Sequence, residues 1–304
     1  GRSSMTVQVH DEVAEALAAG RAVVALESTI FSEFGLPAPV NRRCLEACVG
    51  AIRDGGAVPA ITVVLDGVAR VGLDEAEWDR VLLADRKLGA RDIPVAVAGG
   101  WAAGATTVSG TLSLCALAGV RVFATGGIGG VHRGAEETGD ISADLPAIAR
   151  YPVTTVTAGA KAFLDLPRTV EYLETLGVPV LGLQTDDFPA FYSRSSGVPV
   201  PHRVESPAEA AAVVRSAREL RYDGGVVLAV PIPEAAALPK EAMDAAIADG
   251  LAEADAAGVR GAEVTPFILG RLVDATGGNT LDANVALAVN NARIATELAV
   301  VLGP

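Results

Sequence analysis

The chain has 304 residues, of which half are hydrophobic and 33 are glycine, and its formal net charge is −13. This length and composition suit one large α/β domain or two smaller ones, with enough apolar material for a substantial core. The acidic charge argues against nucleic acids and anionic membranes as partners, because both attract a basic surface, but it leaves a phosphorylated small molecule open. No apolar run reaches the roughly 18 residues that a membrane span needs.

Short apolar runs alternate with helical patterns along most of the chain, and the runs are apolar on both faces, as in a sheet covered by helices on both sides. We expect strands at 22–26, 60–65, 95–98, 120–124, 154–157, 179–183 and 226–230. We expect helices between them at 41–54, 74–84, 105–118, 168–176 and 207–220.

The last quarter of the chain differs, because its periodic segments at 240–258, 265–276 and 281–302 follow one another without a strand between them. The fold prediction is therefore a layered α/β/α sandwich around a mixed, mostly parallel sheet, with a helical C-terminal section. That section would cap the sheet or form an oligomer contact. We expect a single domain over 5–304 and a cloning remnant at 1–4.

The three cysteines are odd in number and have apolar neighbours, which predicts reduced thiols in a cytoplasmic protein. Cys44 and Cys48 would lie one turn apart on a helix, a spacing that metal ligands can use. No nearby histidine or further cysteine completes such a site, so two buried core residues are the favoured interpretation.

A glycine-rich connection at 124–145 follows an expected strand and holds six glycines together with His132, Arg133, Asp140, Ser142 and Asp144. Its spacing is not that of a dinucleotide-binding loop, because His132 stands at the third glycine position, and no Gly-Lys-Ser/Thr of a P-loop follows. Glycine lets backbone N–H groups approach a ligand closely, so the loop predicts an anion-binding site. The alternative is a glycine-rich turn that carries surface charges.

Asp140 and Asp144 flank Ser142 in this connection. One of the carboxylates could bind a hard divalent cation, which prefers oxygen ligands and often keeps water. Alternatively, the segment caps a helix, with Ser142 or Asp140 at the N-cap and Asp144 in the first turn. The two interpretations are compatible, and the residues alone leave both open.

Lys161 follows the expected strand at 154–157 in a small, apolar context, and it is one of three lysines in a chain with 21 arginines. Desolvation lowers the pKa of a lysine, and the neutral amine is then a nucleophile toward a sugar aldehyde. The alternative is a side chain whose ammonium group reaches the surface.

Glu27 ends the first expected strand and is followed by Ser28 and Thr29. The carboxyl ends of strands are where open α/β sheets bind ligands. Burial there would raise the pKa of the carboxyl group toward the range of a proton donor. A capped, solvent-exposed glutamate is the alternative.

Eight segments of the chain resemble the pseudouridine-5′-phosphate glycosidase family, which is related to indigoidine synthase A-like proteins. The resemblance extends from about residue 23 to 298, and the long glycine loop is its most specific part. The segments are 25–30, 35–37, 56–60, 104–108, 123–145, 158–161, 169–179 and 290–292.

This resemblance implies an enzyme with an α/β/α core that splits pseudouridine 5′-phosphate reversibly into uracil and ribose 5-phosphate. It further implies a manganese ion, a homotrimer, Lys161 as the nucleophile that forms a Schiff base, Glu27 as the proton donor and Asp140 as the metal ligand. The expected substrate-binding residues are Lys87, Val108, His132, Ser142, Ala143 and Asp144, with Thr125 and Asn290 added as further inferences.

Two segments depart from the pattern of the family. The sequence at 87–92 lacks a serine and an arginine of the basic Lys-x-Ser-Arg-Arg-Asp stretch, and 99–103 replaces a shorter, more polar turn. We expect both changes to affect phosphate or base contacts. Three alternatives therefore stay open: another phosphorylated C-nucleoside as the substrate, an aldolase-like enzyme acting on a sugar phosphate, and a sugar-phosphate binder without catalysis.

Overall fold

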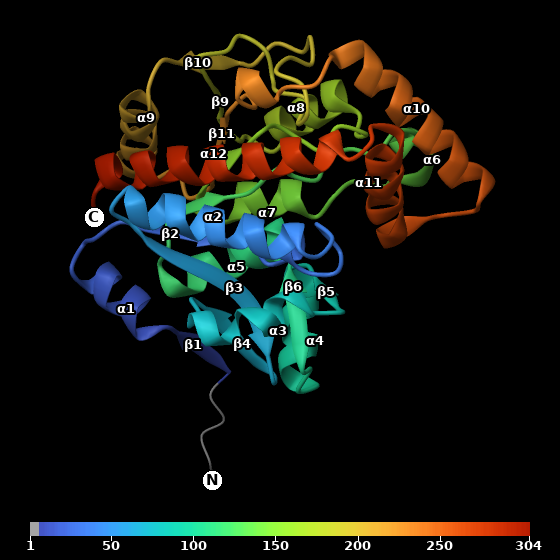
Figure 1. Cartoon of the computed structure of the whole chain (residues 1–304). Helices are drawn as coiled ribbons and strands as arrows, with labels where there is room; N and C mark the ends of the chain where they lie inside the picture. Colours follow the sequence, from blue (N-terminus) through green and yellow to red (C-terminus); the bar gives the residue numbers. More distant parts are fainter. Residues whose placement is uncertain (1–5) are drawn as a thin grey trace.

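A computed structural model describes residues 6–304 and shows a twisted sheet packed between helices (Figure 1). Within these residues the sheet has eleven strands, most of them short. The strands are β1 Val7–Val9, β2 Val23–Leu26, β3 Val58–Leu65, β4 Val68–Val71, β5 Lys87–Leu88, β6 Ala103–Thr106, β7 Val122–Ala124, β8 Thr154–Thr157, β9 Val180–Leu183, β10 His202–Val204 and β11 Val226–Ala229. The five strands β2, β7, β8, β9 and β11 are buried along their whole length.

The sheet is mixed and mostly parallel, as the sequence predicts. Its spatial order is β1-β4-β3-β2-β7-β8-β11-β9-β10, and all neighbours from β3 to β10 run parallel. The long strand β3 changes partners along its length: its first half pairs with β2, whereas its second half pairs antiparallel with both β4 and β6. β3 therefore joins the parallel sheet to a smaller antiparallel corner.

Helices cover both faces of the sheet and complete the predicted α/β/α layering. The helices α2, α9 and α12 pack together on one face, and α5 and α7 lie on the other. The helices are α1 Asp11–Ala18, α2 Val40–Asp54, α3 Trp78–Leu82, α4 Ile93–Ala98, α5 Val108–Ala118, α6 Ala135–Thr138, α7 Asp144–Arg150, α8 Leu166–Thr175, α9 Pro207–Glu219, α10 Lys240–Ala256, α11 Val264–Ala275 and α12 Asn279–Leu302.

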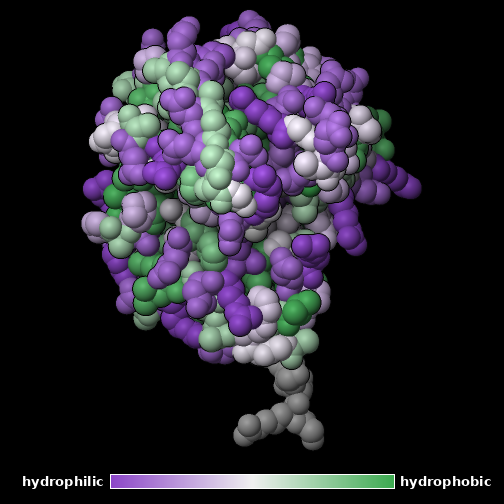
Figure 2. Space-filling model, turned by 90° about the vertical axis from the view of Figure 1, so that its right-hand side faces the viewer, coloured by the Kyte–Doolittle hydropathy of each residue, from purple (hydrophilic) through white to green (hydrophobic). Residues whose placement is uncertain are grey.

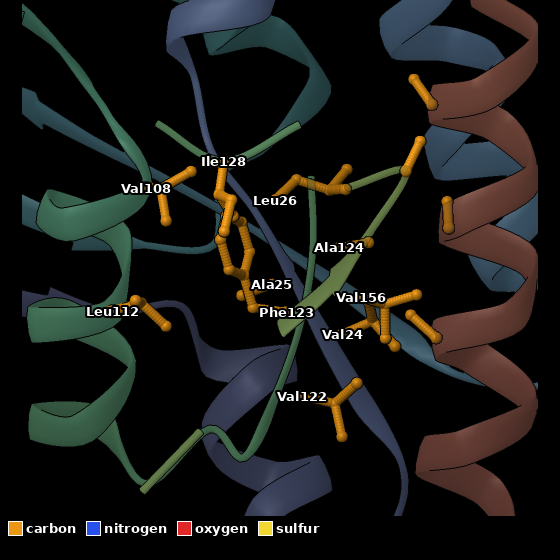
Figure 3. Close-up of a cluster of buried hydrophobic side chains, with 14 of the residues drawn as sticks. Val24, Ala25, Leu26, Val108, Leu112, Val122, Phe123, Ala124, Ile128 and Val156 are labelled. Carbon is orange, nitrogen blue, oxygen red and sulfur yellow. The ribbon is translucent and has the colours of Figure 1, made fainter. Parts of the chain in front are cut away.

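The core lies between these layers, and strand β7 runs through its centre (Figure 3). Successive side chains of a strand point to opposite faces. Accordingly, Phe123 points toward α5 and Leu112, while Ala124 points toward α12. Phe123 is fully buried, and burial of such a side chain contributes about 1.5–3 kcal/mol relative to exposure.

Among the described residues, one helix, α12, is long and apolar enough to cross a membrane by length and composition alone. Its most apolar window is 56% buried, and the helix contacts α2, α9 and β7. A helix in the core of a folded protein can be equally long and apolar. The contacts of α12 with α2, α9 and β7 account for its apolar sequence.

Two expected elements were wrong in type or extent. The apolar run at 95–98 forms part of helix α4 instead of a strand, because Pro94 stands in the first turn of that helix and short apolar runs do not distinguish the two structures. The helix expected at 105–118 begins at Val108, since Ala105 belongs to β6. The remnant expected at 1–4 lies outside the described residues.

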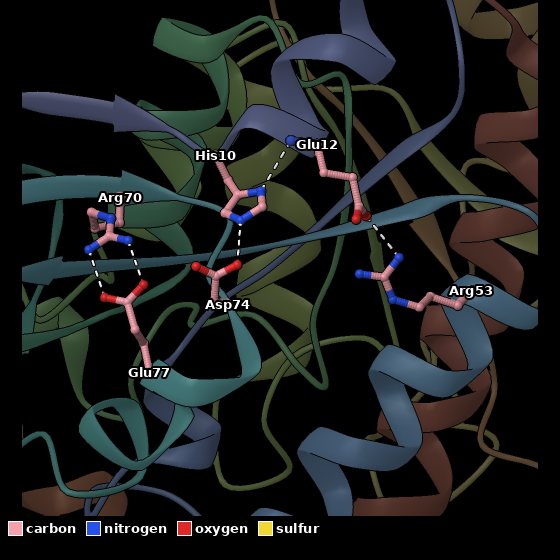
Figure 4. A network of polar contacts seen from close by, with 6 residues as sticks. All are labelled: His10, Glu12, Arg53, Arg70, Asp74 and Glu77. Carbon is pink, nitrogen blue, oxygen red and sulfur yellow. Dashed lines mark hydrogen bonds and ion pairs between the residues drawn. The ribbon is translucent and has the colours of Figure 1, made fainter.

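A polar network joins the N-terminal segment to the antiparallel corner (Figure 4). His10 Nε2 lies 2.7 Å from Asp74 Oδ1, and Arg53 Nη1 lies 2.8 Å from Glu12 Oε1. The guanidinium of Arg70 donates two hydrogen bonds to the carboxylate of Glu77. These contacts lie mostly at the surface, where ion pairs add little stability.

Candidate active site

Three functional side chains follow adjacent parallel strands at one edge of the sheet. Glu27 comes directly after β2, Thr125 directly after β7, and Lys161 four residues after β8. Since β2, β7 and β8 are neighbours and run parallel, their carboxyl ends meet at the same edge. Open α/β sheets bind ligands at this position.

The glycine-rich connection folds back over this edge as a short hairpin. Val131 and Ile141 pair as an antiparallel bridge, and the N–H of Ser142 donates to the carbonyl of Gly130 at 3.0 Å. Near the start of the connection, the N–H of Lys161 donates to the carbonyl of Ile128 at 3.0 Å. The loop is therefore tied directly to the segment that carries the expected nucleophile.

Asp144 holds the loop against helix α5. Its side chain is buried, and its two carboxylate oxygens accept hydrogen bonds from the N–H of Ser109 at 2.9 Å and the N–H of Gly129 at 2.8 Å. A Cβ on Gly129 would stand 2.2 Å from Ser142 Oγ, so only glycine permits this approach. Ser142 Oγ accepts from the N–H of Asp144 at 3.1 Å, and Asp144 lies in the first turn of α7 as expected. The N-cap is Ala143, so the prediction that Ser142 or Asp140 occupies that position was wrong.

A cavity of about 870 Å³ opens beside this loop and contains most of the expected site residues. We call it the polar cavity, because its walls include the loop, the start of α5 and the segment 89–92. The expected residues that line it are Glu27, Lys87, Val108, His132, Asp140, Ser142, Ala143, Asp144 and Lys161.

A second cavity of about 370 Å³ meets the first one, and Glu27, Lys87 and Lys161 line both. We call it the aromatic cavity, because the rings of Phe34, Phe191 and Tyr192 form part of its wall. Apolar side chains complete much of the rest, and they include Ile30, Leu36 and Leu269. The acid and the two amines thus stand at the junction of two chemically different spaces.

Burial sets the protonation of the acid at this junction. Glu27 is only 9% exposed, and burial raises the pKa of its carboxyl group above the ordinary value. The charge of Lys161 and the hydroxyl of Thr125, which donates a short hydrogen bond to Glu27 Oε1, oppose this increase. The net upward shift agrees with the expected proton donor.

Two nearby cations respond to burial in the opposite direction. Burial, together with the charge of Lys161, lowers the pKa of Lys87 to about 8. Burial also lowers the pKa of His132, although the neighbouring Asp140 carboxylate opposes that change. Lys87 can therefore change charge near neutral pH when an anionic ligand enters, and the lowered pKa of His132 favours its neutral form.

Three asparagines of α12 differ in their placement. Asn290 lines neither cavity, and its Oδ1 accepts a hydrogen bond from Arg293 at 2.9 Å. Asn291 instead donates to the carbonyl of Thr125 at 2.7 Å and so supports the loop behind Glu27. Asn284 lines the aromatic cavity, and its buried Oδ1 has no partner among the described residues.

Asn284 is the functional residue that sequence reasoning missed. It lies seven residues before Asn291, a spacing that places both on one face of a helix. Two buried amides on an otherwise apolar face were the available signal. Thr125 was expected to bind the substrate, but it lines neither cavity. Its hydroxyl instead donates a hydrogen bond to Glu27.

Asp140 offers an oxygen donor for a metal at the rim of the polar cavity. Its side chain is 46% exposed, and Oδ2 lies 3.7 Å from His132 Nδ1. Among residues 6–304, no group of three or more histidine, cysteine, aspartate or glutamate side chains gathers around a possible metal position. The donors therefore fit a largely hydrated divalent ion held by one carboxylate, and they do not form a cage of protein ligands.

The two departures from the family pattern lie in different places. Segment 87–92 lines the polar cavity through Lys87 and residues 89–92, so its altered sequence faces that cavity. Segment 99–103 lines neither cavity, and Trp101 instead packs under Arg86, whose Cζ lies 4.1 Å from the ring centroid. The expectation that 99–103 affects phosphate or base contacts of this site was therefore wrong.

Taken together, the fold and site define an α/β enzyme with an acid and a lysine between a polar and an aromatic space. The sequence profile described as "Indigoidine synthase A like protein" matches residues 12–301. The chain belongs to this family.

Relatives named pseudouridine-5′-phosphate glycosidase match nearly the whole chain. One from Methylobacterium nodulans is 53% identical over 293 residues, covering 96% of this chain and 86% of the relative. Another from Myxococcus xanthus is 50% identical over 299 residues, covering 97% and 98%.

Two solved structures share the fold over nearly their full length. The prealnumycin C-glycosynthase AlnA, in complex with ribulose 5-phosphate, superposes with a TM-score of 0.90 at 40% identity, covering 99% of this chain and 97% of that one. An indigoidine synthase A-like protein from Thermotoga maritima gives a TM-score of 0.88 at 35% identity, with the same coverage.

Proposed function

We propose that this protein cleaves the C-glycosidic bond of pseudouridine 5′-phosphate reversibly, giving uracil and ribose 5-phosphate. The observation that carries this proposal is the junction of the two cavities at Glu27, Lys87 and Lys161. A phosphorylated sugar suits the polar cavity, and a flat base suits the aromatic one, so the bond between them would lie at the acid and the lysines. The names of the relatives support the same substrate.

The chemistry requires an electron acceptor, because a base linked through carbon leaves less easily than one linked through nitrogen. The amine of Lys161, acting as a neutral nucleophile, bonds to C1′ as the bond from C1′ to the ring oxygen O4′ breaks, and the proton that the nitrogen loses passes to O4′. As the bond from C1′ to C5 of uracil breaks, the nitrogen electron pair forms a C=N bond to C1′ and the electrons of the broken bond pass to C5. Glu27 supplies the proton to C5, and water then releases ribose 5-phosphate from the lysine.

The polar cavity has donors suited to the phosphate group. Lys87 supplies a positive charge, and Val108 is the first residue of α5, where the helix N-terminus favours a negative charge. The next two N–H groups of this turn, those of Ser109 and Gly110, already donate to Asp144 and Thr107. Ser142 adds a hydroxyl from the glycine loop. These groups would hold the phosphate and so place C1′ near Lys161.

We extend the proposal to a manganese ion at Asp140, which would neutralise part of the phosphate charge while keeping most of its water. The partial exposure of the carboxylate supports this assignment. On the resemblance to the family, we further propose a cytoplasmic homotrimer. The three cysteines are free and buried, which is compatible with a reducing compartment.

A second candidate is the same cleavage, or its reversal, on another phosphorylated C-nucleoside. The altered segment 87–92 in the wall of the polar cavity and the structural similarity to a C-glycosynthase favour it. A simple aldolase acting on sugar phosphates would not need the aromatic cavity, and it is less favoured for that reason.

The test is ultraviolet monitoring of pseudouridine 5′-phosphate with manganese, beside a chelated sample. We expect uracil release with manganese and a strong reduction on chelation. Borohydride reduction with ribose 5-phosphate should add the mass of the reduced sugar phosphate to the peptide that carries Lys161. A modified peptide elsewhere in the chain, or no uracil release under any condition, would contradict the proposal.

A further inference from the structure

Four hydroxyl groups lie in the core beneath the active site, in a place where apolar side chains would be expected. They belong to Ser28, Thr62, Thr106 and Thr111, and all four residues are fully buried. They come from four different segments: the residues after β2, strand β3, strand β6 and helix α5. Because buried hydroxyls are costly unless they are hydrogen-bonded, this cluster needs a physical explanation.

Thr106 is the centre of the cluster. Its Oγ1 lies 2.8 Å from Thr62 Oγ1, 3.1 Å from Ser28 Oγ and 3.2 Å from Thr111 Oγ1, and it donates to the carbonyl of Thr62 at 2.9 Å. Thr62 Oγ1 also lies 2.9 Å from Thr111 Oγ1, which closes a three-membered ring of hydroxyls. Each hydroxyl is thus satisfied by the others.

The backbone of Thr106 binds the segment that carries the acid. Its N–H donates to Ser28 Oγ at 2.8 Å, and its carbonyl accepts from Thr29 Oγ1 at 2.7 Å. Ser28 and Thr29 immediately follow Glu27 in the chain. The position of the Glu27 backbone is therefore fixed through both polar groups of the Thr106 peptide.

The same residue also supports the segment that carries Lys87. The two-residue strand β5 pairs in parallel with β6, with Lys87 opposite Ala105 and Leu88 opposite Thr106. On either side of this pair, the N–H of Ala105 donates to the carbonyl of Arg86 at 2.8 Å and the N–H of Thr107 donates to that of Leu88 at 2.9 Å. Strand β6 therefore stands between the acid and the lysine.

We propose that Thr106 is a positioning residue that fixes the carboxyl of Glu27 and the ammonium of Lys87 relative to each other across the junction of the cavities. This inference rests on the proposed function. Directional hydrogen bonds hold four segments in one register, whereas apolar side chains of similar size can repack with small shifts. A shift of about 1 Å at reacting groups can cost on the order of a hundredfold in rate.

Thr155 provides a matched control in the same sheet. It is also fully buried, on β8, but its Oγ1 has no hydrogen-bond partner among the described residues. Replacing either threonine by valine preserves shape and removes one buried hydroxyl. Thr106→Val keeps the backbone hydrogen bonds of residue 106 and the pairing of β6 with β5, but it removes the hydroxyl that contacts Ser28, Thr62 and Thr111. Of the two substitutions, only this one breaks the hydroxyl cluster that holds β6 in register with the segment of Glu27.

The experiment compares the wild type with Thr106→Val, Thr106→Ser and Thr155→Val. We expect kcat for uracil release to fall about tenfold or more in Thr106→Val, with KM changed less than about threefold, and to recover largely in Thr106→Ser. Borohydride trapping of ribose 5-phosphate at Lys161 should persist in all variants, because the cluster does not contact that segment. Thr155→Val should behave as the wild type.

A second readout does not need catalysis. The chain has three lysines, so ¹³C-methylation of the amines gives few resonances, and the signal of Lys87 is assigned by its loss in Lys87→Arg. In the folded protein Lys161, Asp144 and Glu27 are the charged groups around Lys87. Valine keeps the backbone pairing of β5 with β6, so loss of the cluster acts on Lys87 through a shift of β6. Such a shift in Thr106→Val should reduce the burial of the amine and raise its pKa from about 8 toward 10.5.

The outcomes separate the two proposals. If the wild type releases no uracil, the proposed function fails, and the titration of Lys87 still tests the role of Thr106. A wild-type kcat together with an unchanged Lys87 titration in Thr106→Val would overturn the inference, as would equal losses in Thr155→Val. If Thr106→Val does not fold, Thr111→Val replaces it, because that change removes one side of the hydroxyl ring and should give a smaller loss of the same kind.

Discussion

The polar cavity and the aromatic cavity meet at Glu27, Lys87 and Lys161, yet their remaining walls come from different parts of the chain. Segments 89–92 and 129–151 contribute most of the polar side, whereas 30–37 and 266–284 contribute much of the aromatic side. The first wall offers N–H groups, hydroxyls and cations, and the second offers rings and one unpaired amide oxygen. Under the proposed function, the sugar phosphate and the base would occupy separate spaces and be joined only at the reacting bond.

Removing the nucleophile should have the largest effect on this arrangement. In Lys161→Ala the amine that bonds to C1′ is lost while both walls remain, so kcat should fall by about 10⁴-fold or more. Ultraviolet assays give the rate, and borohydride trapping with ribose 5-phosphate should yield no adduct. Residual turnover at a tenth of the wild-type rate would show that another group carries the chemistry.

Removing the proton donor should separate sugar binding from bond cleavage. Glu27→Gln keeps the size of the side chain, so trapping at Lys161 should persist while kcat falls by about 10²- to 10⁴-fold. Since burial raises the pKa of Glu27, the protonated acid persists to higher pH, and wild-type kcat should fall as pH rises through that value. The Gln variant should lack this fall, and a variant that kept it would assign the titration to another group.

Changing the cation of the polar wall should affect binding more than chemistry. With a pKa of about 8, Lys87 is charged below that pH and loses its charge above it, so KM for the phosphorylated substrate should rise above about pH 8. Lys87→Met should raise KM by about tenfold to a hundredfold at neutral pH, because a charged hydrogen bond is lost, and should flatten the rise with pH. An unchanged KM would place the phosphate elsewhere.

The smallest effect should come from the aromatic wall. Asn284→Ala removes the amide that faces the base, so inhibition by uracil should weaken by about tenfold, which corresponds to about 1.4 kcal/mol. Trapping of ribose 5-phosphate should be unchanged, because the sugar phosphate lies on the other side. Asn290→Ala is the matched control on the same helix and should leave both measurements as in the wild type. Equal effects of the two variants would remove Asn284 from the base site.

Much of the layered sheet was predictable, because strands such as Thr154–Thr157 are continuous apolar or β-branched runs between clear helical periods. Strands β1 and β10, at the two ends of the sheet order, were not predicted. Strands β4, β5 and β6 were not predicted either. They have two to four residues each, and their pairing with β3 or with one another depends on distant parts of the chain. Local patterns carry little information about such contacts.

The site shows the same division between local and distant signals. Glu27 and Lys161 could be singled out because each follows an expected strand, and their meeting at one edge follows from parallel pairing. The lowered pKa of Lys87 could not be derived from its local sequence, since its burial depends on β6 and on the charges around it. Asn284 was missed for a similar reason, because only the packing of α12 brings it to the aromatic cavity.

Strand β3 changes partners halfway along its length, and this feature divides the scaffold into a part that holds the reacting groups and a corner that carries Lys87. Neither 30–37 nor 266–284 contributes a strand to either part, and both ranges include residues that line the aromatic cavity. A directed search for enzymes that accept other bases could therefore vary those two segments alone. The borohydride-trapped adduct of ribose 5-phosphate at Lys161 would then identify the variants that still react with the sugar phosphate.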